Sequence, residues 1–134
     1  MQSFYCSLSQ LPGLDRKELA LLESRGIQTT QQLLALTRSL EAKQILAIEL
    51  QLPLKYIHKW SALADLARVP AVGDRYCGLL LHSGIASVNQ LAQVSVAKLH
   101  PTIKRLYVNT TRSTDLIPQP SLVQKWIEEA RVLS

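Results

Sequence analysis

Apolar residues recur three or four positions apart in several segments of the chain, which is the spacing of helices with one buried face. Asp15 and Glu18 have the spacing of a capping box, so a helix is predicted to begin there and to end before Gly26. The two longest helices are predicted at 54–67 and 121–133. No segment shows the two-residue alternation of a strand, so the pattern predicts an all-α protein.

Serine, threonine and proline residues divide the remaining sequence into shorter predicted helices. These are expected at 31–36, from Ser39 to Pro53, at 74–82, at 88–94 and after Ser95. Pro101 is expected to break or restart the last of them, and the β-branched run at 107–111 leaves both helix and strand open. The prediction is therefore about eight helices.

An internal repeat organises the chain. Similar residues lie 58 positions apart: Pro12 and Pro70, Leu21-Leu22 and Leu79-Leu80, Gly26-Ile27 and Gly84-Ile85, Gln32-Leu33 and Gln90-Leu91. Lys59-Trp60 and Lys125-Trp126 then match at an offset of 66, so the second copy carries eight extra residues. The repeat predicts a pseudo-two-fold duplication, with an extension at 1–10, a first unit at 11–67 and a second unit at 68–134, packed as one compact module.

The repeat also leads to two packing predictions. Trp60 and Trp126 hold equivalent positions on amphipathic helices and are expected in the core. The first unit has only ten residues before Leu11, so no clear helix precedes its first turn. We expect helix 121–133, the repeat partner of helix 54–67, to pack into that place.

The distribution of charge points to a partner. Residues 55–112 carry eight basic and two acidic side chains, a net charge of +6. The net charge is 0 for residues 1–54 and −1 for residues 113–134, which together give the total of +5. A basic middle segment is compatible with a polyanionic partner, and equally with an ordinary solvated surface.

No arrangement of residues in the sequence predicts an enzyme. Cys6 and Cys77 are too sparse for a disulfide framework or a zinc site, and the histidines lack metal-ligand spacing. No serine, cysteine or lysine has the context of a nucleophile, so no metal, cofactor or small-molecule substrate is expected. The chain has neither an apolar run of about 20 residues nor the pattern of a signal peptide, which predicts a cytoplasmic protein outside the membrane.

Both units contain segments that resemble the helix-hairpin-helix family, in which a Pro-Gly-apolar-Gly hairpin, a helix and a Gly-Ile turn follow one another. The segments are Leu11-Pro12-Gly13-Leu14-Asp15 with Gly26-Ile27-Gln28-Thr29, and Val69-Pro70-Ala71-Val72-Gly73 with Gly84-Ile85-Ala86-Ser87. More closely, residues 11–133 resemble the family called domain of unknown function 4332, in stretches that include Lys59-Trp60, Ala64-Asp65-Leu66 and Lys125-Trp126-Ile127. The resemblance implies a tandem helix-hairpin-helix (SAM-like) fold in a bacterial, often cyanobacterial, protein, and it implies no established activity.

A hairpin of this kind suits a phosphate group, because free backbone N–H groups and the helix dipole meet at the turn. Paired hairpins would hold duplex DNA without reading its bases. The candidate DNA-binding residues are those of the two turns and the basic residues near them or in the basic segment: Gly13, Leu14, Arg16, Lys17, Ala71, Val72, Gly73, Arg75, Lys98, Lys104 and Arg105.

Neither hairpin matches the family pattern completely. Asp15 replaces the second glycine of the first hairpin, and Ala71 replaces the first glycine of the second, where Asp74 also follows. A carboxylate at a helix N-terminus satisfies the dipole and repels phosphate. Two functions therefore stay open. The first is DNA binding that is not sequence-specific and weakens with salt. The second is a protein-interaction module, which predicts an apolar surface patch.

Overall fold

The computed structural model of the chain describes residues 1–111 and 117–134. Over these residues the protein has eight α-helices, one short 3-10 helix and no strand, apart from an isolated bridge between Ser7 and Thr29. The elements are η1 (Leu8–Gln10), α1 (Arg16–Ser24), α2 (Thr30–Ala35), α3 (Leu40–Leu50), α4 (Leu54–Ala67), α5 (Gly73–His82), α6 (Val88–Gln93), α7 (Val96–Thr111) and α8 (Pro120–Leu133). The prediction of an all-α protein with about eight helices is confirmed. Arg112 of the basic segment lies outside the described residues.

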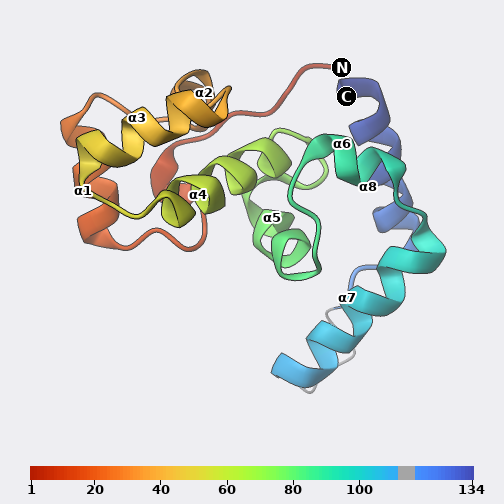
Figure 1. Cartoon of the computed structure of the whole chain (residues 1–134). Helices are drawn as coiled ribbons and strands as arrows, with labels where there is room; N and C mark the ends of the chain where they lie inside the picture. Colours follow the sequence, from red (N-terminus) through yellow and green to blue (C-terminus); the bar gives the residue numbers. More distant parts are fainter. Residues whose placement is uncertain (112–116) are drawn as a thin grey trace.

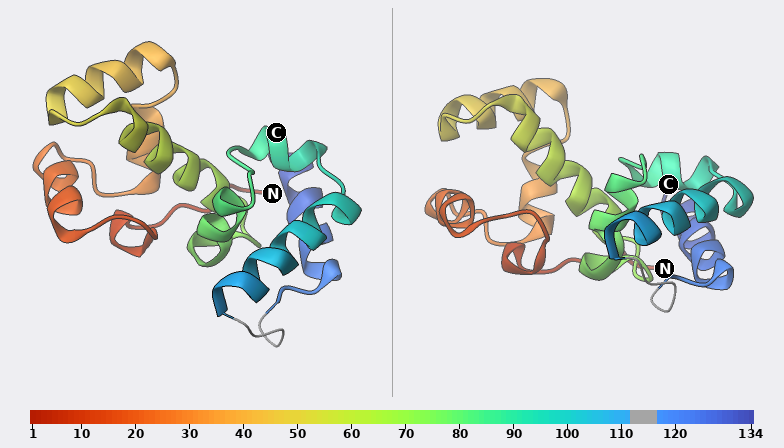
Figure 2. Two further views of the ribbon diagram at one scale, coloured as in Figure 1. Left: turned by 60° about the horizontal axis from the view of Figure 1, so that its bottom comes forward. Right: turned by 90° about the horizontal axis from the view of Figure 1, so that it is seen from below.

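The helices form two groups that α4 joins (Figure 1). Helices α1, α2 and α3 lie on one side and α5 to α8 on the other, which the two further views also show (Figure 2). Helix α4 packs against α2 and α3 in the first group and against α5 in the second. The turn between α4 and α5 therefore lies where the two groups meet.

Residues 1–10 are part of this packing and reach both groups. The backbone N–H of Cys6 donates to Thr30 Oγ1 at 3.0 Å, and Leu8, which is fully buried, donates to the carbonyl of Gln28 at 2.9 Å. Further towards the N-terminus, the N–H of Phe4 donates to the carbonyl of Arg68 at 2.7 Å. The N-terminal segment thus ties α2 to the turn after α4.

Local sequence signals set most helix ends. Asp15 and Glu18 form both halves of the predicted capping box on α1. The helices α1 and α5 end at glycines with positive φ, Gly26 at 76° and Gly84 at 91°. Behind each glycine an isoleucine N–H turns back to a leucine carbonyl at 3.0 Å, Ile27 to Leu22 and Ile85 to Leu80. The same hydrogen bond therefore occurs twice, 58 residues apart.

The core runs through both groups of helices. Trp60 and Trp126 are fully buried in it, so their predicted place in the core is confirmed. No helix among the described residues has the length and apolar character needed to cross a membrane.

Two sequence expectations are wrong. Helix α7 continues through Pro101, because one missing N–H removes a single helical hydrogen bond while Leu99 and Ile103, on either side, stay buried. Helix α8 packs against α6 and α7 rather than before the first hairpin. The residues directly before the first turn form only the short 3-10 helix η1, and Lys59 of α4 lies against Gly13 of the turn.

Candidate functional site

The turn of the second hairpin, between α4 and α5, has its backbone groups occupied. The N–H groups of Val72 and Gly73 both donate to the carbonyl of Val69 at 2.9 Å. The N–H of Ala71 donates to Glu129 Oε1 of α8 at 2.8 Å, and Trp126 Nε1 of α8 donates to the carbonyl of Ala71 at 3.0 Å. A carboxylate of the chain itself thus accepts the hydrogen bond that a phosphate was expected to accept.

The turn of the first hairpin is closed in a different way. Gly13 has a φ of +80° and lies against Lys59 and Leu63 of α4. The N–H of Asp15 donates to Glu18 Oε1 at 3.1 Å, and the N–H of Glu18 donates to Asp15 Oδ1 at 2.7 Å. The N-terminus of α1 is therefore satisfied by its own carboxylates.

The last helix of each predicted unit, α4 for residues 11–67 and α8 for residues 68–134, lies against a hairpin turn. Lys59 and Leu63 of α4 lie against the first turn, and Trp126 and Glu129 of α8 bind the second. Trp126 has a hydrogen-bond partner there, whereas the buried Nε1 of Trp60 has none among the described residues. The two turns thus occupy similar surroundings with different polar contacts.

The basic residues singled out from the sequence are all exposed and fall on separate elements. Arg16 and Lys17 lie in the first turn of α1, Arg75 lies on α5, and Lys98, Lys104 and Arg105 lie on α7. The Arg75 guanidinium lies over the ring of Tyr76, 5.1 Å from its centroid. No hydrogen bond or ion pair among the described residues links the three basic residues of α7 to either hairpin turn.

Sequence reasoning missed a cleft of about 610 Å³ between α4 and the segment that joins α2 to α3. Tyr5 of the N-terminal segment also lines the cleft, as do Ala86 and Ser87, which lie just before α6. Four basic or potentially basic side chains line it: Arg38, Lys43, His58 and Arg68. They lie up to 30 positions apart in the sequence (38 to 68), so no local motif could have grouped them.

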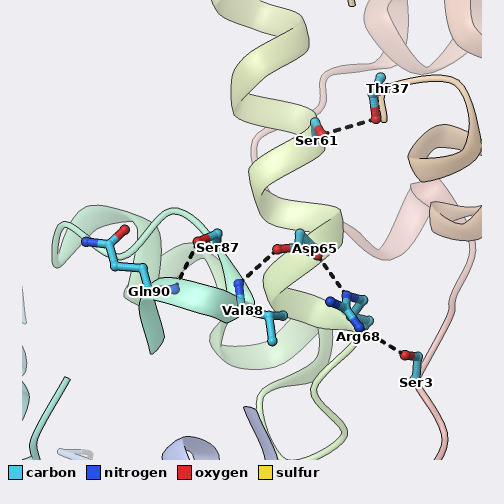
Figure 3. A network of polar contacts seen from close by, with 8 residues as sticks. All are labelled: Ser3, Thr37, Ser61, Asp65, Arg68, Ser87, Val88 and Gln90. Carbon is cyan, nitrogen blue, oxygen red and sulfur yellow. Dashed lines mark hydrogen bonds and ion pairs between the residues drawn. The ribbon is translucent and has the colours of Figure 1, made fainter. Parts of the chain in front are cut away.

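Asp65, the only carboxylate among the described residues that line the cleft, has both oxygens in hydrogen bonds (Figure 3). Its Oδ1 accepts from Arg68 Nε at 2.7 Å, and its Oδ2 accepts from the N–H of Val88 at 2.8 Å. Arg68 also donates to Ser3 Oγ at 3.3 Å, so the network joins α4 to both α6 and the N-terminal segment. Ser61, one turn before Asp65, donates to Thr37 Oγ1 at 3.1 Å.

The sequence matches the family described as Domain of unknown function (DUF4332) over residues 12–133. The chain belongs to the DUF4332 family. Searches of the curated proteins and of the solved structures find no significant match. The resemblance seen in the sequence is thereby confirmed for DUF4332, and the family description itself names no activity.

This DUF4332 protein exposes a second surface feature, an apolar face on α3 and the residues just before it. Leu36, Leu40, Ile45 and Ile48 are exposed by 47%, 55%, 51% and 77%. Two shallow depressions border this face, one of about 260 Å³ beside Leu36 and Ile45 and one of about 490 Å³ beside Ile48. We call these four residues the α3 apolar face.

The two cysteines of this DUF4332 protein are free and buried. Burial raises the pKa of Cys77 from 9.0 to about 12, and burial with the nearby Asp74 charge raises that of Cys6. Both thiols therefore stay protonated and unreactive at neutral pH.

Proposed function

We propose that this protein is a non-enzymatic binding module of two helix-hairpin-helix units, duplicated from one ancestral unit, whose partner is another protein. The duplication is supported by the hydrogen bonds that recur 58 residues apart. The backbone N–H of Gln28 and that of Ala86 each donate to a glutamine four residues later, at 2.7 and 2.9 Å. The two buried free cysteines fit a reducing, cytoplasmic setting.

The main observation in favour of a protein partner is the α3 apolar face. Helix α3 packs against α4 and buries Leu46, Ala47 and Leu50, yet Ile45 and Ile48 are exposed on its solvent side. A surface helix normally places polar residues on that side. Several large apolar side chains gathered on one surface are typical of interaction sites, whereas single ones are ordinary.

The occupied hairpin turns support the same choice. A phosphate would need the N–H of Ala71, which Glu129 holds, or the N-terminus of α1, which Asp15 and Glu18 satisfy. Each carboxylate would also repel a phosphate. DNA binding through the turns would therefore require these contacts to break first.

A photo-crosslinking amino acid at position 48 tests the proposal in extracts of cells that express the protein. We expect a discrete protein adduct that disappears when Ile45→Asp is added to the same chain. Val132 on α8 is 63% exposed and offers the matched control, because no other large apolar residue of α8 is exposed. Equal adducts at positions 48 and 132, or no adduct at 48, would refute a protein partner on this face.

Duplex DNA is the second candidate partner, and one observation favours it. The exposed side chains of Arg75, Lys98, Lys104 and Arg105 form no ion pair with any described residue, so no carboxylate in that part of the chain neutralises them. A DNA titration at two salt concentrations separates the candidates. Binding that falls steeply with salt and is lost in Arg75→Glu would assign the protein to DNA.

A further inference from the structure

The cleft between α4 and the α2–α3 segment has an unbalanced charge. Arg68 and the N–H of Val88 together satisfy both oxygens of Asp65. This leaves the charges of Arg38 and Lys43 without a counter-charge in the lining. Arg38 makes no hydrogen bond or ion pair with the described part of the chain, and Lys43 Nζ contacts only His58 Nδ1, at 3.5 Å.

Holding two uncompensated cations at one concave site costs free energy through their mutual repulsion. An anion placed between them would remove that cost. A guanidinium offers a planar pair of donors that fits phosphate or carboxylate oxygens, and an ammonium adds a compact point charge. A phosphate group supplies close to two negative charges in a small volume, which matches the two free cations better than one carboxylate does.

The size and lining of the cleft favour a small molecule. Its volume of about 610 Å³ falls within the range of roughly 300–1,000 Å³ that is usual for ligand pockets. Leu34 and Ala62 supply an apolar wall beside the charged groups, and Tyr5 supplies an aromatic ring with a hydroxyl group. Such a mixture suits a ligand with a phosphate at one end and an organic part at the other.

We propose that this cleft is a binding site for a small phosphate-bearing ligand, whose phosphate contacts Arg38 and Lys43. The site draws on α3, α4 and the loop before α3, and its charged side chains are not part of the α3 apolar face. The proposal of a ligand site therefore does not depend on the proposed protein partner.

Calorimetric titration with inorganic pyrophosphate tests the site directly. We expect saturable binding that weakens about tenfold or more in Arg38→Gln and in Lys43→Gln, since each substitution removes a charge-assisted hydrogen bond. Lys125→Gln is the matched control, because it removes one exposed positive charge from α8, away from the cleft and from the candidate DNA-binding residues. Arg38 is exposed and Lys43 half-buried, and circular dichroism verifies that the variants keep their helices.

Chemical-shift mapping on the unmodified protein gives a second readout. Pyrophosphate should shift the amide signals of Arg38, Lys43 and Ala62 and leave those of α7 in place. No saturable binding, or an equal loss of affinity in Lys125→Gln, would overturn the proposal. Tighter binding of a hexaglutamate peptide than of pyrophosphate would also overturn it, because the cleft would then suit an acidic protein segment.

Discussion

Replacing Glu129 tests how firmly α8 closes the second hairpin. The side chain is 8% exposed and accepts the Ala71 N–H at 2.8 Å. In Glu129→Ala the partly buried N–H of Ala71 loses its acceptor, and leaving such a group unsatisfied costs up to about 1–3 kcal/mol. Glu129→Gln keeps a carbonyl oxygen at the same distance and loses only the charge, so its cost should be about 1 kcal/mol or less.

Urea denaturation gives these free energies, and amide hydrogen exchange reports on Ala71 itself. The expected order of unfolding free energies is wild type, then Glu129→Gln, then Glu129→Ala. Glu128 is the control, since this exposed neighbour bonds only to Gln124 at 3.0 Å, and Glu128→Ala should change little. An Ala71 amide as well protected in Glu129→Ala as in the wild type would refute the reasoning.

Two further predictions concern buried groups. Trp126→Phe should destabilise the protein by about 1 kcal/mol more than Trp60→Phe, because only Trp126 donates a hydrogen bond, to the Ala71 carbonyl. Equal losses in urea denaturation would contradict this. The free energy of unfolding should fall as the pH rises from 9.0 to about 12, because the unfolded chain releases the Cys77 thiol proton and the folded protein keeps it. The slope from this residue reaches at most about 1.4 kcal/mol per pH unit, and it should vanish in Cys77→Ala; an unchanged slope would contradict the assignment.

The parts of the fold that depend on local chemistry were predictable from the sequence. Caps such as Asp15 and Ser87 act on backbone groups within three residues, and Gly26 and Gly84 are needed wherever φ is positive. The interacting residues of each such signal are close together in the sequence. Helix ends and the all-α class therefore followed directly.

The candidate sites depend on contacts between distant segments and were harder to predict. Glu129 accepts a hydrogen bond from Ala71, 58 positions away, and no pattern near either residue in the sequence predicts that bond. Arg38 and Lys43 join one cleft with Arg68 only because α4 packs against α2 and α3. The predicted break at Pro101 was wrong for a similar reason. Helix α7 continues because the burial of Leu99 and Ile103 outweighs the lost hydrogen bond.

The contact of α8 with the second turn has a consequence for the order of events on the ribosome. The first turn needs Lys59 and Leu63 of α4, which are made 46 and 50 residues after Gly13. The Ala71 turn needs Trp126 and Glu129, which are made 55 and 58 residues after it. Each turn can therefore close only once the last helix of its own unit has been made, and the first unit can settle while the second is still being synthesised.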